Sequence, residues 1–108
     1  MTVAELSTRL NAENICLPYP EREVVGAYVG DLLSWVMGRA PADCSWVTIM
    51  SNLNVVAVAS LADVACIILS EDVALDDDAL KKAEKEGINI LSVKESSYEV
   101  CASLSDLL

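Results

Sequence analysis

The sequence contains no histidine and no phenylalanine, and its only aromatic residues are two tryptophans and three tyrosines. Histidine is the most common general base and the most common metal ligand, so most hydrolytic mechanisms lose their usual catalytic group. The chain also lacks the G-x-x-x-x-G-K-[ST] loop that cradles nucleotide phosphates; its nearest feature is GAYVG at 26–30, which matches neither that motif nor G-x-G-x-x-G. These absences exclude a kinase that works through such a phosphate-binding loop.

Basic residues are scarce as well: 7 lysines and arginines stand against 17 aspartates and glutamates, for a net charge of -10. Such a chain repels nucleic-acid phosphates and anionic lipid head groups, so neither nucleic acid nor a membrane is an expected partner. A length of 108 residues without linkers or low-complexity segments predicts one domain, 1–108. The first residues, MTVAELSTRLNAE, include Glu5 and Arg9 and no apolar signal segment, so we expect a cytoplasmic protein.

The four cysteines form no C-x-x-C pair, which is the usual spacing of zinc ligands and of thiol-exchange sites. Free cysteine is among the most buried residue types and packs as a small apolar side chain. We therefore expect reduced, mostly buried thiols and no disulfide framework at Cys16, Cys44, Cys66 and Cys101.

One long stretch, Cys44–Ala62 (CSWVTIMSNLNVVAVASLA), carries no charge at all. A membrane-spanning helix needs about 20 predominantly apolar residues, but here Ser51, Asn52 and Asn54 interrupt the middle of the run. The stretch therefore indicates a buried core.

This core run divides into a strand over 45–50, a helix over 53–62 that starts after Asn52, and another strand over 65–69. The valines near its middle leave a β-hairpin through SNLN as an alternative. A strand, crossover helix and parallel strand account for the whole stretch better, because a central parallel strand is apolar on both faces.

The same unit then repeats, with a helix over 76–86 that stops at Gly87 and a strand over 88–93, giving a βαβαβ wind. The three aspartates at 76–78 also suggest a metal site, but we favour a solvated helix end with the pairs Asp77–Lys81 and Asp78–Lys82. No metal ligand, catalytic residue or cofactor is predicted.

Further elements flank the wind. Capping boxes at Thr2/Glu5 and Ser96/Glu99 predict the starts of a first and a last helix. The segments 13–17 and 23–28 are expected to be extended. Asp31 is expected to cap a helix over 32–37, which Gly38 and Pro41 end.

A ligand site is expected at the carboxyl ends of the parallel strands, where open α/β sheets bind their ligands. Ser51, Asn52 and Asn54 follow the first strand of the wind, and the two asparagines can bond a base or ribose; Lys94 follows the third strand and can meet a phosphate. Each has an alternative role, since Asn52 also serves as a helix cap and Lys94 also fits a solvated loop. The expected ligand-binding residues are Ser51, Asn52, Asn54 and Lys94.

The stretches VVGAYVGDLLSWVM, SWVTIMSNLNVVAVASLADVACIILSED, ALKKAEKEGINILSV and SSYEVCASLSDLL together cover nearly the whole chain. In these motifs the chain resembles the stand-alone DRTGG-domain proteins of anaerobic bacteria, and it is similar to the N-terminal domain of HPr kinase/phosphorylase without the kinase domain. The D-R-T-G-G string itself is absent, because the residues after the strand at 65–69 read SEDVALDD.

The resemblance implies a three-layer α/β/α fold with a mainly parallel sheet. It also implies a non-catalytic regulatory domain, homodimeric, that senses an adenine nucleotide, as suggested by the related domains attached to pyrophosphatases. An alternative is an interaction subunit that docks on a neighbouring redox or hydrogenase enzyme through Trp35, Met37 and Trp46. A third alternative, an enzyme with a lone cysteine nucleophile, would need a basic neighbour that the sequence does not show.

Overall fold

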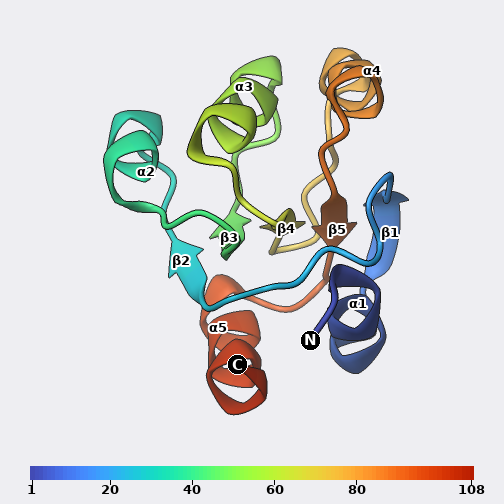
Figure 1. Ribbon diagram of the computed structural model, residues 1–108, viewed down its shortest axis with the longest axis vertical. Helices are drawn as coiled ribbons and strands as arrows, with labels where there is room; N and C mark the ends of the chain where they lie inside the picture. The colour runs from blue at the N-terminus through green and yellow to red at the C-terminus, as the bar shows by residue number, and fades with distance from the viewer.

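The computed structural model describes all 108 residues and has three layers (Figure 1). A five-stranded sheet with the order β1-β5-β4-β3-β2 lies in the middle, covered by α2, α3 and α4 on one face and by α1 and α5 on the other. Only β1 runs antiparallel to its neighbour. The elements are α1 (Val3–Leu10), β1 (Glu13–Cys16), β2 (Ala27–Val29), α2 (Leu33–Arg39), β3 (Ser45–Thr48), α3 (Leu53–Ala62), β4 (Cys66–Leu69), α4 (Asp77–Glu86), β5 (Ile90–Ser92) and α5 (Ser97–Leu107). The expected α/β/α fold with a mainly parallel sheet is confirmed.

The uncharged run forms the centre of this fold. Every residue of β3 and β4 is buried, because each strand has a neighbour on both sides and helices on both faces. Between them, α3 begins after Asn52, whose Oδ1 accepts the backbone N–H of Asn54 at 2.9 Å. The strand–helix–strand interpretation is thus confirmed, and the alternative of a β-hairpin was wrong. None of the helices is both long and apolar enough to cross a membrane.

Most of the expected helix ends are also present. Both capping boxes form, at Thr2/Glu5 and at Ser96/Glu99, and α4 ends at Gly87 with a φ of 75°. The expected pairs Asp77–Lys81 and Asp78–Lys82 do not form; Lys82 pairs instead with Glu86, one turn later, at 3.7 Å.

The prediction for α2 was wrong in two respects. The helix starts at Leu33 with no side-chain cap, and it continues through Gly38 to Arg39 before Pro41. The carboxylate of Asp31 instead accepts the Thr48 hydroxyl at 2.8 Å and the Ile49 N–H at 3.0 Å. Thr48 is buried at the end of β3, so its hydroxyl needs a partner inside the protein.

The expected extended segment 23–28 forms a strand only over Ala27–Val29. Its start is delayed because Gly26 has a φ of 74°, which breaks the extended backbone.

Two apolar clusters fill the space on the two faces of the sheet. Cys16, Cys44 and Cys66 are buried in them as free thiols, as expected, and burial raises the pKa of Cys66 to about 12. Trp46 is also fully buried and its indole N–H donates to the Gly30 carbonyl at 2.9 Å, so the expectation that it is an exposed docking residue was wrong.

Candidate ligand-binding hollow

The segment that joins β1 to β2, here called the crossing segment (residues 17–26), has an unusual path. Its two strands are the opposite edges of the sheet, so it runs across the full width of the sheet (Figure 1). Cys16 lies opposite the first residue of β5, and Ala27 lies opposite the first residue of β3. The crossing segment therefore follows the amino-terminal ends of the parallel strands.

Two side chains hold the crossing segment in place. Asn89, which is buried just before β5, accepts the Tyr19 N–H at 2.9 Å and donates to the carbonyls of Tyr19 at 2.8 Å and Ala65 at 3.1 Å. Arg22 donates from Nη2 to Asp43 Oδ1 and Asp63 Oδ1, both at 2.9 Å, and to the Asp63 carbonyl at 2.7 Å. The backbone at Tyr19 and the side chain of Arg22 thus have fixed positions.

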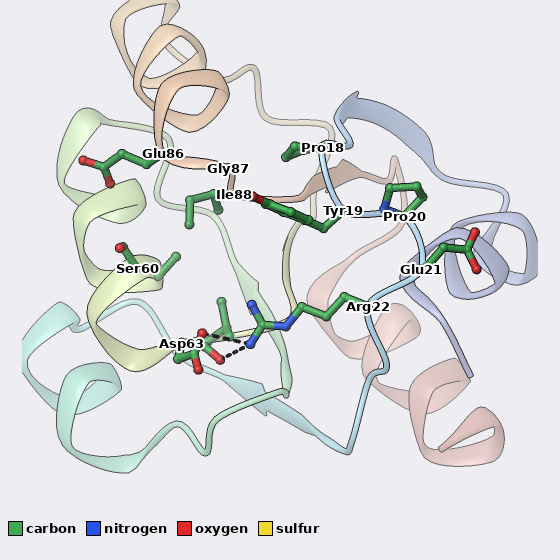
Figure 2. Close-up of a pocket in the computed structure, with 12 residues that line it drawn as sticks. Pro18, Tyr19, Pro20, Glu21, Arg22, Ser60, Asp63, Glu86, Gly87 and Ile88 are labelled. Atoms are coloured by element: carbon green, nitrogen blue, oxygen red, sulfur yellow. Dashed lines mark hydrogen bonds and ion pairs between the residues drawn. The ribbon is translucent and has the colours of Figure 1, made fainter.

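A hollow of about 530 Å³ opens between the crossing segment and the C-terminal ends of α3 and α4 (Figure 2). Tyr19 and Arg22 line it from the crossing segment, Ser60 and Asp63 from the end of α3, and Gly87 from the end of α4. Small-molecule sites usually enclose about 300–1,000 Å³, so the hollow has the size of a ligand site.

Tyr19 lies at the wall of this hollow, and the residue is 59% exposed. Its hydroxyl end rests against Gly87 (Figure 2), where an added Cβ would meet Tyr19 Cε2 at 2.6 Å. Gly87 also has the positive φ that favours glycine, so the position is restricted for two reasons. The ring is thus a flat apolar surface with a defined place.

Arg22 contributes the only cation of the lining. All three hydrogen bonds of its side chain leave from Nη2, and Nε and Nη1 have no partner within the chain. Partial burial acts to lower the pKa of Arg22, but the hydrogen bonds to Asp43 and Asp63 outweigh it and raise that pKa. The guanidinium therefore stays charged. Its Nη2 is bonded to the two aspartates, and its Nε and Nη1 are free to donate to a ligand.

The remaining charges of the lining are acidic. Glu21, Asp63 and Glu86 contribute three carboxylates against the one guanidinium of Arg22, which leaves two net negative charges. The lining holds no cysteine. The arrangement offers stacking and hydrogen bonds, which are the interactions of a binding site.

The residues that the sequence assigned to ligand binding lie at the other end of the strands. Ser51 and Asn52 follow β3, Asn54 is in the first turn of α3, and Lys94 follows β5. Because β4 separates β3 from β5, Lys94 is about two strand spacings, roughly 10 Å, from the others. The structure thus brings Ser51, Asn52 and Asn54 together and keeps Lys94 apart.

Three of these residues have identified contacts or neighbours within the chain. The Asn52 side chain caps α3, and the Ser51 carbonyl accepts the Asp76 N–H at 3.0 Å. Lys94 lines a smaller hollow whose other charged residues are Glu13, Asp72 and Glu95. Their assignment to a ligand stays a prediction.

Sequence reasoning did not select Tyr19, Arg22 or Asn89. One signal was available, since prolines on both sides of Tyr19 favour a stiff extended segment. A second was the polar Asn89 inside the apolar string INIL, because a buried amide needs partners from another part of the chain.

Comparison with solved structures finds a match to the crystal structure of the CBS and DRTGG domains of the regulatory region of Clostridium perfringens pyrophosphatase, complexed with the activator diadenosine tetraphosphate. The TM-score is 0.71 at 12% sequence identity, and the match covers 95% of the present chain but only 47% of the other, so the present chain spans about half of that length. The likeness shows a shared fold. No curated protein sequence matches the chain. The family model of the DRTGG domain matches residues 40–107, well over half of the sequence, and the chain therefore belongs to the DRTGG domain family.

Proposed function

We propose that the protein is a non-catalytic regulatory domain that senses a small ligand, and that residues 1–108 act as one such unit. The observation that carries the proposal is the fold shared with the regulatory region of a pyrophosphatase over 95% of the chain. The ligand-sized hollow supports it, and so does the absence of histidine and of a phosphate-binding loop. A similarity to the N-terminal domain of HPr kinase/phosphorylase is part of the same proposal.

The cysteines also support a non-catalytic role. A nucleophilic thiol must ionise near neutral pH, beside a base or a cation. Burial instead raises the pKa of Cys66 to about 12 and that of Cys44 to about 11, and it also raises the pKa values of Cys16 and Cys101.

The ligand that we propose is an adenine nucleotide. The pyrophosphatase region binds diadenosine tetraphosphate, in a chain about twice as long as the part that the present chain matches. Two places on the present chain are candidates: the carboxyl end of the sheet, with Ser51, Asn52, Asn54 and Lys94, and the hollow beside Tyr19 at the amino end.

Calorimetric titration and thermal unfolding with AMP, ADP, ATP, diadenosine tetraphosphate and inorganic phosphate, with and without magnesium, test this function. At 100 times Kd, a ligand should stabilise the domain by about 2.7 kcal/mol, which raises the unfolding midpoint by roughly 10 °C or more in a domain of this size. Selective binding without turnover is the expected result. A flat response to every adenine compound would overturn the nucleotide proposal.

A second candidate function is an interaction subunit for a neighbouring redox or hydrogenase enzyme. The observation that favours it is the exposure of Trp35 and Met37 on α2, at 52% and 49%, with the Arg39 guanidinium 3.7 Å from the Trp35 ring centre. Its test is titration of a purified partner enzyme of that class with the protein and with the variant Trp35→Ser/Met37→Ser. Binding that the double variant abolishes would support this role, and absence of binding would remove it.

A further inference from the structure

We infer that the hollow beside Tyr19 is the site of the ligand's base: it takes a neutral, planar heterocycle of the nucleoside class, stacked on the Tyr19 ring and hydrogen-bonded to the free side of the Arg22 guanidinium. The choice of adenine rests on the proposed function. The ligand class rests on the hollow itself.

The ring provides the first contact. Tyr19 is more than half exposed, while Asn89 bonds its backbone N–H and carbonyl and Gly87 leaves room for its hydroxyl end. A ring that is open to solvent on an anchored backbone can stack on a base at a smaller loss of conformational freedom. Pro18 and Pro20 stiffen the backbone on either side.

The guanidinium provides the second contact. Asp43 and Asp63 orient Arg22 through Nη2, so Nε and Nη1 remain as donors that no group of the protein uses. Figure 2 shows this guanidinium on the same side of the hollow as Asp63, below the Tyr19 ring. The unprotonated ring nitrogens of a nucleobase are acceptors that fit such donors.

The charge of the lining decides which part of a nucleotide enters. Asp43 and Asp63 already compensate the Arg22 charge, and Glu21 and Glu86 add to the negative side. A phosphate inside the hollow would meet like charges, whereas a neutral base would not. The phosphates of a bound nucleotide therefore point out of the hollow into solvent.

The test is titration of the full chain with adenosine, guanosine, uridine, AMP and ATP at low and high salt. The main variant, Tyr19→Leu, removes the ring and keeps apolar bulk, and Tyr19→Phe keeps the ring. The matched control is Tyr98→Leu on α5, where the tyrosine is 83% exposed on the opposite face of the sheet. Lys94→Met and Asn54→Ala report on the other end of the strands. Circular dichroism and urea midpoints check that each variant folds.

We expect a nucleoside to bind, with Tyr19→Leu at least about tenfold weaker, since a stacked base contributes about that much. Tyr19→Phe, Tyr98→Leu, Lys94→Met and Asn54→Ala should stay within about threefold of the original chain. Added phosphates should not improve affinity, and salt should strengthen ATP binding by screening the repulsion.

Four results decide whether the inference, the proposed adenine sensor or both are overturned. Nucleotide binding that is unchanged in Tyr19→Leu but weakened in Lys94→Met would overturn the inference and keep the function. Competition by inorganic phosphate alone would overturn the inference too. Binding of guanosine or uridine only, lost in Tyr19→Leu, would support the inference and remove the adenine sensor. If no nucleoside or nucleotide binds at millimolar concentration, both are overturned.

Discussion

Asp31 shows how much one side chain contributes to this fold. A single carboxylate oxygen accepts the hydroxyl of buried Thr48 and the N–H of Ile49, and so joins the loop after β2 to the end of β3. The Met50 N–H in turn bonds the Thr48 hydroxyl at 3.1 Å, which extends the network by one residue. Removing Asp31 leaves a buried hydroxyl without an acceptor.

We therefore expect Asp31→Ala to lower the free energy of unfolding by about 1–3 kcal/mol, because unsatisfied buried polar groups are costly. Urea denaturation measures the loss. Asp31→Asn keeps an acceptor oxygen and should lose less. The control is Asp106→Ala, an exposed aspartate in the last turn of α5, which should change stability by under about 0.5 kcal/mol. Equal losses in Asp31→Ala and Asp106→Ala would contradict this role.

At the scale of the elements, signals that lie close together in sequence were reliable. The range 53–62 of α3 and both capping boxes follow from side chains that bond backbone groups two or three residues away. The buried strands follow from their uncharged, β-branched sequences.

Long-range contacts were not predictable in the same way. Asp31 is a residue type that often caps helices. In the fold its carboxylate instead bonds Thr48, which is 17 positions away in the sequence, and no local pattern indicates that contact. Tyr19 and Asn89 are 70 positions apart, and no local pattern pairs them. The hollow depends on where the crossing segment lies, which follows from the order of the strands.

Strand β4 gives a prediction on pH. The pKa of the Cys66 thiol is about 12 in the folded chain, raised by burial from an ordinary value near 9. The unfolded chain therefore loses this proton first, so the stabilisation is complete below about pH 9 and falls as pH rises toward 12. At about pH 10 the loss approaches about 1.4 kcal/mol for one thiol.

Urea unfolding at about pH 8 and pH 10 measures this loss. Cys66→Ala should be less stable at both pH values because of the lost packing, but its stability should fall by about 1 kcal/mol less between them. Cys101→Ala, at a half-buried position, should change the pH dependence less. Parallel pH profiles for the original chain and Cys66→Ala would contradict the prediction.

At the scale of the whole molecule, β2 is an edge strand that is open to pairing with another chain. Its outer side pairs with no strand, and the strand carries neither lysine nor proline to protect it. Val25, Val29, Leu32 and Trp35, on or beside this edge and in α2, are each more than half exposed. With a net charge of -10, two copies meet most easily at such an uncharged surface.

We propose a homodimer that uses the β2 edge. Light scattering at tens of micromolar should give twice the 11.6 kDa of one chain, and added salt should strengthen the association. Val29→Lys should give a monomer, because it places a charge in the contact. Leu61→Lys, at an equally apolar and 75% exposed position on α3, is the control and should remain dimeric. A monomeric original chain would remove the dimer, and a dimeric Val29→Lys would place the contact elsewhere.

The pairing of β1 with β5 also sets an order for assembly as the chain is made. Glu13 lies opposite Ser92, so β1 pairs with a strand that follows it by more than 70 residues in the chain. In the crossing segment, Tyr19 likewise reaches its position only when Asn89, which bonds its backbone, and Gly87, which lies beside its ring, are present. Strands β2, β3 and β4 follow one another in the sequence and pair with their neighbours, whereas β1 has no strand partner until β5 is present. The pairing of β1 is thus completed only with β5, and the hollow is complete only once the chain has been made as far as Ile88.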